Sequence, residues 1–309
     1  MQKILVTTSS FDVSLFSNLI ANTQKPIEVV LNPYKRKLTE QEVSELLTED
    51  VIGMIAGVEP ITENVMNNAK SLKVISRCGV GMDSVNLEAA KKLGIIVTNT
   101  PDAPTVPVAE LTMAHMLNLL RHVSLVNDEI KNSKWEPKMG ALLNGKTVGI
   151  IGYGRIGRKV ASLVQAFGAN ILVFDIFPVN SNDKIKQVEL NQVLINADII
   201  SLHLPYTTEN HHFISTEQFA LMKPTALVLN ISRGGLINET ALLEALQNKS
   251  IAGAGIDAFE KEPYSGPLCQ LSNVLLTAHM GSYAKEARFI QEQDSVKNLF
   301  SKLTELNLY

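Results

Sequence analysis

The N-terminal third of the chain alternates two kinds of apolar pattern. Short apolar runs predict β-strands, and segments whose apolar residues recur every three or four positions predict helices. The predicted strands are Lys3–Thr7, Glu28–Leu31, Val51–Ile55, Lys73–Ser76 and Ile95–Thr98. The predicted helices lie near 12–21, 39–48, 61–70 and 86–93. Thr39 and Thr62 have the character of helix starts, and Thr39 has capping-box spacing to Glu42.

Three prolines, Pro101, Pro104 and Pro107, separate this part from a long helical segment. Pro107 suits the first turn of that helix, which we expect to run from about Val108 to Ile130. The segment is apolar nearly all round, which is typical of a buried helix. We therefore expect it between two domains, in a subunit interface, or in both.

A second series of strands and helices begins at Lys146. Its predicted strands are Val148–Ile151, Ile171–Phe174, Ile199–Leu202, Ala226–Asn230, Ile251–Ile256 and Val274–Thr277. A last helical segment, about 282–306, is expected to return to the first domain. Strands that alternate with helices favour mostly parallel sheets covered on both faces, so the pattern predicts an α/β fold with two Rossmann-like domains.

Length and charge narrow the function classes. A chain of 309 residues suggests about two domains, and its formal net charge of −3 argues against nucleic acid or an anionic membrane as the main partner. No apolar run reaches the roughly 18 residues of a spanning helix, and the start MQKILVTTSS lacks a secretory pattern, so we expect a cytoplasmic protein. The two cysteines and six histidines follow no metal-binding spacing, so we expect neither a disulfide nor a metal site.

The sharpest motif is the glycine run Gly152-Tyr153-Gly154-Arg155-Ile156-Gly157. It follows a predicted strand directly and opens a helical pattern that Gly168 ends, which is the context that a dinucleotide fingerprint requires. Gly152 permits the tight turn, Gly154 lets a pyrophosphate approach the backbone, and Gly157 lets helix and strand pack closely. The helix N-terminus offers free N–H groups to the phosphates.

Asp175 completes this fingerprint. It ends the next predicted strand, about 18 residues after Gly157, where an acid can accept hydrogen bonds from the hydroxyls of the adenosine ribose. Its charge would repel a 2′-phosphate, and its neighbours Ile176 and Phe177 supply no cation. The motif therefore predicts a site for NAD(H) rather than NADP(H).

Three later segments place polar residues after predicted strands, at the sheet edge where open α/β folds bind ligands. They are Asn230–Gly235, Gly255–Pro263 and Thr277–Ser282. Taken singly, Arg233, Glu262 or His279 could be a surface cation, a solvated acid or a core histidine. Three such groups at the edge of one nucleotide-binding sheet instead indicate a site for catalysis.

With these segments in place, the chain resembles the D-isomer-specific 2-hydroxyacid dehydrogenases, in particular their phosphoglycerate dehydrogenase-like branch. The resemblance runs from about Ile75 to Ser282. Besides the glycine run and the three segments above, it includes Arg77–Asp83, Asn99-Thr100-Pro101, Val108–Leu111, Gly145-Lys146-Thr147, Leu202–Pro205 and Met222-Lys223-Pro224.

The resemblance implies a set of site residues. Arg233, Glu262 and His279 form the catalytic trio, and the backbone amides of Val80 and Gly81 hold the substrate carboxylate. Arg233 and His279 also belong to the implied substrate-binding residues. Asp257 accepts from the nicotinamide carboxamide. The implied cofactor-binding residues are Gly152, Gly154, Arg155, Ile156, Gly157, Asp175, Leu204, Pro205, Ile231, Ser232, Asp257 and Gly281. His203 is left out of the catalytic set, because the family uses its position for the cofactor wall.

The chemistry of the trio agrees with hydride transfer between C2 of a 2-hydroxy acid and nicotinamide. His279 is the candidate base, because an imidazole titrates near the working pH. Glu262 would orient it, and Arg233 can clamp carboxylate and ketone oxygens in bidentate fashion. Glutamate at 262 points to 2-hydroxy acids, since glutamine is expected there in formate dehydrogenases. An NAD-sensing binding protein or corepressor-like scaffold is the alternative of another class, and the complete trio counts against it.

The substrate is less well marked. Phosphoglycerate dehydrogenases are expected to place an arginine in the loop after the third strand, where this chain has Ala56–Pro60 with an acid, Glu59. Lys35–Lys37, in the loop after the second strand, could reach a phosphate or could be a solvated basic loop. The alternative is a hydroxypyruvate or glyoxylate reductase. The chain ends at Tyr309, so feedback by serine through a C-terminal regulatory domain is not expected.

The expected architecture joins these parts. The substrate-binding domain, flavodoxin-like, is expected at 1–99 plus 285–309, and the NAD-binding Rossmann domain at 100–284. We expect the active site in the interdomain cleft, with closure that excludes water. The apolar helix 108–130 favours a homodimer.

Overall fold

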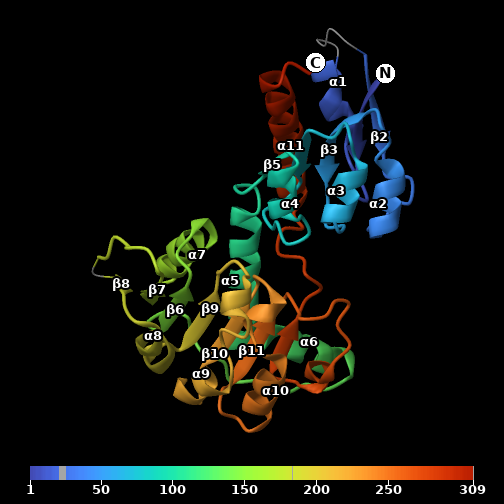
Figure 1. Ribbon diagram of the computed structural model, residues 1–309. Coiled ribbons are helices and arrows are strands. Elements are labelled where there is room, and N and C mark those ends of the chain that lie inside the picture. Colours follow the sequence, from blue (N-terminus) through green and yellow to red (C-terminus); the bar gives the residue numbers. More distant parts are fainter. Residues whose placement is uncertain (21–25, 183, 309) are drawn as a thin grey trace. The chain divides into compact units, whose positions relative to one another are not determined.

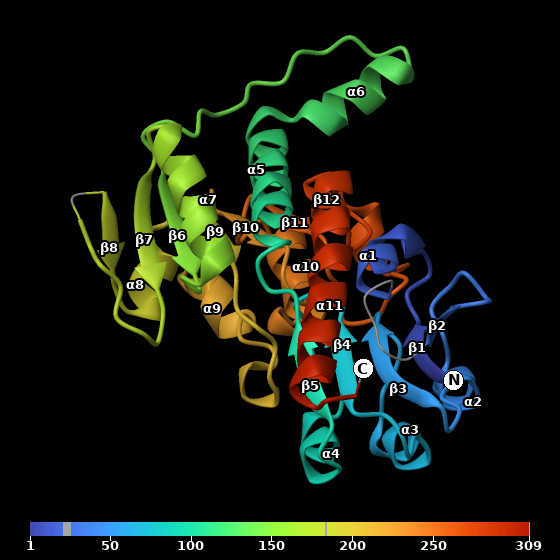
Figure 2. The same ribbon diagram turned by 90° about the horizontal axis from the view of Figure 1, so that it is seen from above.

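A computed structural model describes residues 1–20, 26–182 and 184–308 (Figures 1 and 2). Contacts between residues divide the chain into two units. Unit 1 consists of residues 1–104 and 284–309, and unit 2 of residues 105–283. Among the described residues each unit contains one parallel sheet with helices on it, so the α/β fold with two parallel sheets is confirmed.

Unit 1 has a five-stranded sheet, as far as its residues are described, in the order β2-β1-β3-β4-β5. The strands are β1 (Gln2–Val6), β2 (Ile27–Leu31), β3 (Val51–Ala56), β4 (Val74–Arg77) and β5 (Ile96–Asn99). The helices are a 3-10 turn (Val13–Phe16), α1 (Ser17–Ile20), α2 (Glu40–Leu46), α3 (Glu63–Asn68), α4 (Leu87–Lys92) and α11 (Lys285–Glu305). The helix predicted at 12–21 begins as the 3-10 turn, and residue 21 lies outside the described residues.

Alternate residues of these strands supply two cores. Leu5, Met54 and Ile75 pack with α2, α3 and α4 on one face of the sheet. Ile4, Ile55 and Val74 pack with α11 on the other face, since neighbouring side chains on a strand point to opposite faces. The predicted helix starts are confirmed. Thr39 and Glu42 form a capping box on α2, and Thr62 caps α3.

Unit 2 has a seven-stranded sheet within its described part, in the order β12-β11-β10-β9-β6-β7-β8. The strands are β6 (Thr147–Ile151), β7 (Asn170–Phe174), β8 (Ile185–Gln187), β9 (Ile199–Leu202), β10 (Leu227–Asn230), β11 (Gly253–Ile256) and β12 (Val274–Leu276). All their pairings are parallel. Only β8 was not predicted, because its three residues lie in a polar segment. The strand order reverses between β6 and β9, which creates the switch point where such sheets bind ligands.

Helices cover both faces of the sheet in unit 2. α5 (Thr105–Arg121) and α7 (Arg155–Ala166) pack on one face, around Val148 and Ile150. α8 (Leu190–Asn196), α9 (Thr216–Leu221) and α10 (Glu239–Gln247) pack on the other, around Ile200 and Val228. The carboxyl ends of the central strands are therefore held rigidly by two packed layers.

The prediction of one buried helix from Val108 to Ile130 is wrong. The chain forms α5 and then α6 (Val123–Lys131), because His122 adopts a left-handed conformation with φ 56° between them. α5 is substantially buried, whereas no residue of α6 is buried. The apolar pattern predicted burial here because α6 contains apolar side chains, but these side chains, among them Val123 and Ile130, are exposed. In the described part of the chain, no helix has both the length and the apolarity to cross a membrane.

Candidate active site

The glycine run connects β6 to α7 at the switch point of the sheet. Gly152 has φ +93°, a conformation that favours glycine. A Cβ on Gly157 would lie 2.1 Å from the Gly152 carbonyl oxygen, so only glycine lets the helix start this close to the strand. Gly154 is the N-cap of α7, and a Cβ there would meet nothing within 4 Å. The backbone is therefore open at the point where a pyrophosphate would approach the helix N-terminus.

Asp175 follows β7 and lies beside the glycine run. Its Oδ2 accepts from the backbone N–H of Tyr153 at 2.5 Å, and its Oδ1 accepts from the N–H of Phe177 at 2.9 Å. The two bonds hold the carboxylate at the sheet edge. Ile176 and Phe177 are exposed there. The open Gly154 backbone and the fixed acid fit an NAD molecule with its pyrophosphate on α7 and its adenosine ribose on Asp175.

The loops after β9 and β10 form a neighbouring wall. A Cβ on Gly152 would lie 3.0 Å from Leu204 Cδ2, so Leu204 packs directly on the glycine turn. Ser232 donates from Oγ to the Leu202 carbonyl at 2.5 Å, which ties the two loops together. His203 is bonded through Nε2 to Ser201 Oγ at 2.9 Å, and burial lowers its pKa to about 4. His203 is therefore neutral at physiological pH, which suits a wall better than an acid or base.

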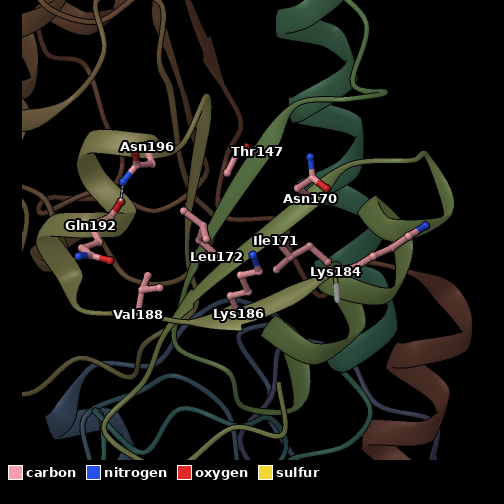
Figure 3. A pocket seen from close by; sticks show the side chains of 9 residues that line it. All are labelled: Thr147, Asn170, Ile171, Leu172, Lys184, Lys186, Val188, Gln192 and Asn196. Atoms are coloured by element: carbon pink, nitrogen blue, oxygen red, sulfur yellow. Dashed lines mark hydrogen bonds between the residues drawn. The ribbon is translucent and has the colours of Figure 1, made fainter. Parts of the chain in front are cut away.

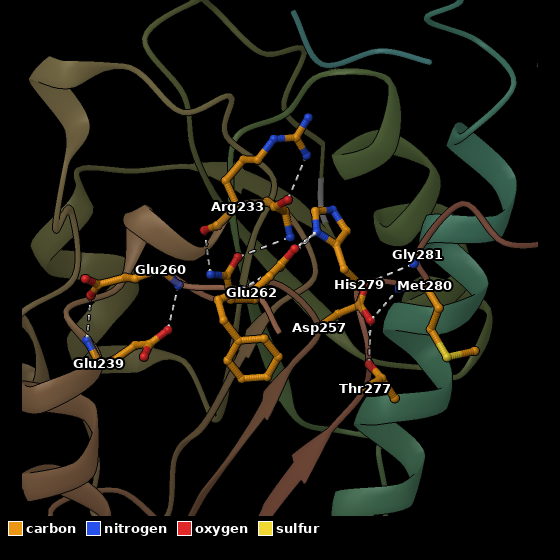
Figure 4. A network of polar contacts seen from close by, with 12 residues as sticks. Arg233, Glu239, Asp257, Glu260, Glu262, Thr277, His279, Met280 and Gly281 are labelled. Atoms are coloured by element: carbon orange, nitrogen blue, oxygen red, sulfur yellow. Dashed lines mark hydrogen bonds and ion pairs between the residues drawn. The ribbon is translucent and has the colours of Figure 1, made fainter. Parts of the chain in front are cut away.

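Glu262 and His279 come from the loops after β11 and β12 and meet in Figure 4. His279 Nδ1 lies 2.9 Å from both Glu262 Oε1 and Oε2. Glu262 Oε1 also accepts from the backbone N–H of Phe259 at 3.1 Å, which fixes the carboxylate. A carboxylate only accepts, so Nδ1 carries the proton in this contact, and Nε2 is the ring nitrogen left to accept a substrate proton.

Arg233 follows β10 on the same edge (Figure 4). Its NH1 donates to the Ser232 carbonyl at 2.8 Å, and its own carbonyl accepts from Asn230 Nδ2 at 2.8 Å. A Cβ on the next residue, Gly234, would lie 1.9 Å from the Phe259 carbonyl carbon. The arginine loop and the Glu262 loop therefore pack against each other without an intervening side chain.

Asp257 directly follows β11 and is 1% exposed. Its Oδ1 accepts from Thr277 Oγ1 at 2.6 Å and from Met280 N–H at 2.9 Å, and its Oδ2 accepts from Gly281 N–H at 2.8 Å. A Cβ on Gly281 would lie 3.4 Å from Ile231 Cγ2. The structure thus brings together Ile231, Asp257 and Gly281, three of the predicted cofactor-binding residues.

Comparison with known proteins decides the family. Residues 113–281, more than half of the chain, match the profile described as D-isomer specific 2-hydroxyacid dehydrogenase, NAD binding domain. The chain belongs to the D-isomer-specific 2-hydroxyacid dehydrogenase family. The matched residues are its NAD-binding domain, which agrees with the fit of the glycine run and Asp175.

Two curated relatives and one solved structure show how far the likeness extends. D-3-phosphoglycerate dehydrogenase of Methanocaldococcus jannaschii is 42% identical over 258 residues, 81% of this chain and 49% of that protein. Hydroxypyruvate reductase of Thermotoga maritima is 35% identical over 272 residues, 86% of this chain and 89% of that protein. The TT0316 protein of Thermus thermophilus has a TM-score of 0.90 at 34% identity, covering 98% of this chain and 97% of its own. The chain spans about half the length of the phosphoglycerate dehydrogenases that it matches.

The predicted substrate residues of this family member, Val80 and Gly81, lie after β4 in unit 1. Glu59, the acid in the loop where a phosphate-binding arginine is expected, lies after β3 and is 1% exposed. It accepts from the Gly57 N–H at 2.9 Å and from Thr7 Oγ1. Its carboxylate is therefore turned into unit 1, where it fixes the loop.

The basic loop offered as an alternative phosphate site is partly engaged. Arg36 forms a bidentate pair with Glu42, NH2 to Oε1 at 2.6 Å and NH1 to Oε2 at 2.9 Å. Its guanidinium also lies 4.9 Å from the centre of the Tyr34 ring. The pairing with Glu42 lowers the pKa of that carboxyl to about 2, as does the capping contact with Thr39. Arg36 is thus held by α2, and Lys35 and Lys37 are the other cations of the loop.

A shallow pocket of roughly 300 Å³ lies elsewhere on unit 2 (Figure 3). Thr147 and Asn170, which line it, are the first residues of β6 and β7, and Lys184 and Lys186 project beside them. The pocket is therefore at the amino ends of these strands, whereas the glycine run and Asp175 are at their carboxyl ends. It takes no part in the candidate active site.

The sequence did not single out two residues that the structure connects to the site. His115 on α5 and Thr277 after β12 are linked to each other and, through Thr277, to Asp257. Thr277 begins the segment Thr277–Ser282 that follows a predicted strand, and His115 is a polar residue within the predicted apolar helix Val108–Ile130. A histidine in an apolar helix was the only indication of its role, and a hydrogen-bonded core histidine without a role in the site gives the same sequence pattern.

Proposed function

We propose that this chain is an NAD-dependent D-2-hydroxyacid dehydrogenase of the phosphoglycerate dehydrogenase-like branch. The observation that carries the proposal is the contact of His279 Nδ1 with both oxygens of Glu262, 2.9 Å each, on the sheet edge that also carries the glycine run. This contact leaves an oriented imidazole nitrogen for proton transfer. Arg233 supplies the cation on the same edge (Figure 4).

In the oxidising direction, the glycine run and Asp175 would hold NAD⁺, which would supply the acceptor for the hydride from C2 of the hydroxy acid. His279 takes the hydroxyl proton at Nε2, so the C2 hydroxyl becomes a ketone. Glu262 keeps the ring oriented and offsets the charge of the imidazolium that results. Arg233 binds the carboxylate and the C2 oxygen, because a guanidinium fork matches two acceptors at once. In the reducing direction His279 returns the proton.

Two substrate classes fit the site, a phosphorylated 3-carbon acid and a small unphosphorylated acid such as hydroxypyruvate or glyoxylate. The relatives named phosphoglycerate dehydrogenase favour the first. The relative named hydroxypyruvate reductase favours the second, as does the pairing of Arg36 with Glu42, which engages one cation of the basic loop. Binding of the substrate carboxylate by the amides of Val80 and Gly81 and a cytoplasmic location stay predictions.

The activity is tested by NADH oxidation with a panel of 2-keto acids that includes phosphohydroxypyruvate, hydroxypyruvate and glyoxylate. We expect turnover with at least one of them and a preference for NADH over NADPH. Bound NADH without turnover of any keto acid would refute the enzyme and favour an NAD-sensing binding protein. Neutralising Lys35, Arg36 and Lys37 together then tests whether this loop binds a phosphate. If it does, the KM for phosphohydroxypyruvate should rise and the KM for hydroxypyruvate should not.

We further propose that the chain forms a homodimer through the α6 surface, defined by Val123, Ile130, Trp135, Met139 and Leu142. All five side chains are exposed, with Trp135 85% and Met139 95% exposed. They lie on α6 and on the extended segment that follows it (Figure 2). Large apolar side chains gathered on one segment are typical of an interface.

A further inference from the structure

Buried polar side chains connect helix α5 with the end of strand β11. His115 is 1% exposed on α5, and its Nε2 lies 3.0 Å from Thr277 Oγ1. Thr277 Oγ1 in turn lies 2.6 Å from Asp257 Oδ1. All three residues belong to unit 2, so their contacts depend only on how that unit folds.

The direction of both hydrogen bonds follows from the donors available. A carboxylate can only accept, so the single hydroxyl proton of Thr277 is donated to Asp257. The Thr277 oxygen then accepts from His115, which must carry its proton on Nε2. His115 Nδ1 is therefore the unprotonated nitrogen. It is buried without a hydrogen-bond partner among the described residues, which costs less for an acceptor lone pair than for an N–H group.

The surroundings of His115 keep the ring in this state. Burial lowers its pKa to about 4, although the negative charge of Asp257 opposes the shift. The ring is therefore neutral near pH 7, and the hydrogen-bond directions do not change there. A Cβ on Gly255 would lie 2.7 Å from His115 Nδ1, so the missing side chain on β11 is what lets the ring lie against the strand.

Asp257 holds the backbone on both sides of His279. Its carbonyl accepts from the His279 N–H at 2.8 Å, and its carboxylate accepts from Met280 and Gly281 as described above (Figure 4). His279 itself has φ +49°, a left-handed conformation that disfavours residues with a side chain. The hydrogen bonds to Asp257 hold His279 in this conformation, and the conformation directs the imidazole toward Glu262.

We propose that His115, acting through Thr277 and Asp257, is a positioning residue for the catalytic base His279. The neutral imidazole donates to Thr277, which orients the threonine proton toward Asp257, and Asp257 fixes the loop that aims His279. This proposal rests on the dehydrogenase activity proposed above. It adds to that activity two residues, His115 and Thr277, that act through Asp257.

The kinetic test uses Thr277→Val, which removes the hydroxyl without changing the size of the side chain. We expect kcat for keto-acid reduction to fall roughly 10- to 100-fold, because small misplacements of a reacting group cost this much. The NADH dissociation constant should change far less than kcat. The solvent deuterium isotope effect on kcat should rise, since proton transfer from a poorly aimed His279 becomes rate-limiting. Thr277→Ser should restore kcat, and His115→Leu should show a smaller loss of the same kind.

Thr112→Val is the matched control. Thr112 is buried on α5, and its hydroxyl donates to the Val108 carbonyl of the same helix at 2.7 Å. Its loss should leave kcat and the isotope effect as in the unmodified protein. Equal kcat losses in Thr112→Val and Thr277→Val, or no rescue by serine, would overturn the proposal, because they would indicate a general packing defect.

A second measurement does not depend on turnover. Correlation spectra of the ¹⁵N-labelled ring nitrogens of the unmodified protein report which nitrogen of His115 carries the proton. We expect a neutral ring protonated on Nε2 near pH 7. A ring protonated on Nδ1, or on both nitrogens, would overturn the chain of hydrogen bonds even in an active enzyme. If the protein turned over no keto acid but His115 had the expected tautomer, the hydrogen-bond arrangement would be supported and the proposed function refuted.

Discussion

At the scale of single residues, the candidate site is organised by acids that accept from backbone N–H groups. Asp175 accepts from two such groups, Asp257 from two and Glu262 from one. Loops that leave a parallel sheet have N–H groups that no strand pairs with, and a carboxylate satisfies several of them at once. Each acid thus shapes its loop and lies at the sheet edge.

The first residue-scale prediction concerns His279. We expect His279→Ala to abolish keto-acid turnover, because general acid–base catalysis by a positioned side chain is worth about 10²–10⁴-fold. NADH binding, measured by the quenching or enhancement of its fluorescence, should be largely retained. Substantial activity in this variant would remove His279 from the role of base.

The second residue-scale prediction concerns Asp175. We expect Asp175→Asn to raise the ratio of NADPH to NADH in kcat/KM by about tenfold or more, because a like charge facing the 2′-phosphate costs upward of a kcal/mol. Asp198→Asn is the control, since Asp198 accepts from the Thr147 N–H at 2.9 Å at the opposite end of β6. An unchanged cofactor ratio in Asp175→Asn, or an equal change in the control, would argue against cofactor selection by Asp175.

At the scale of elements, the termini of helices decide where the chain turns. α2 begins after a capping box and α7 begins after its N-cap Gly154, and both starts were visible in the sequence. The break between α5 and α6 was not visible, because histidine at 122 is no sequence signal for a left-handed residue. It becomes intelligible only with the bond from the Ser124 N–H to Asn118 Oδ1, 2.9 Å, which spans the break.

The break yields a stability prediction. His122→Gly should leave the free energy of unfolding nearly unchanged, whereas His122→Val should lower it by about 1–2 kcal/mol, because a β-branched residue disfavours φ 56°. Denaturant titration measures both. At Asn127, an exposed position inside α6, the order should reverse, with glycine costing more than valine. The same order at both positions would contradict a left-handed His122.

Glu42 on α2 gives a prediction about pH. Its folded-state pKa is about 2, below the ordinary glutamate value of 4.5, mainly through the hydrogen bonds from Arg36. A depressed carboxyl pKa stabilises the fold above the unfolded pKa, and this contribution is lost as pH falls from about 4.5 to about 2. Glu42→Gln should therefore be less stable than the unmodified protein near neutral pH, and the difference should shrink below about pH 4. Urea titrations at several pH values measure this.

The control for Glu42 is Glu45→Gln on the same helix. Glu45 accepts from Gln41 Nε2 at 2.9 Å, whereas the Arg36 guanidinium pairs with Glu42. A constant difference between Glu42→Gln and the unmodified protein across the acid range would show that the Arg36 pair does not act on the titration of Glu42.

At the scale of the whole molecule, the two units share an architecture and differ in what they present. Both have parallel sheets with helices on two faces, but the glycine fingerprint and the proposed catalytic trio all belong to unit 2. Unit 2 also carries the α6 surface, whose apolar side chains its own core leaves exposed. Cofactor binding, the proposed chemistry and the proposed self-association therefore reside in one unit.

The α6 surface makes the last prediction. The unmodified chain, of 33.8 kDa, should elute with about twice that mass in light-scattering chromatography, as the commonest oligomers are two-fold dimers. Trp135→Glu or Met139→Glu should shift it toward the single-chain mass, because a charge would be buried at the interface. Ile195→Glu is the control, since Ile195 is exposed on α8, which lies apart from α6 in Figures 1 and 2. If the unmodified protein eluted with the mass of a single chain, the proposed dimer would be refuted.

The sequence by itself determined the α/β class, most strands, the glycine fingerprint and the candidate trio. These features depend on local patterns, since a strand's alternation, a capping residue or a glycine turn is written in neighbouring residues. Only the tertiary structure decided that Glu262 meets His279, that Glu59 turns inward, and that His115 reaches Asp257 through Thr277. Such contacts join residues far apart in the chain, and their direction depends on packing and burial, which no local pattern records.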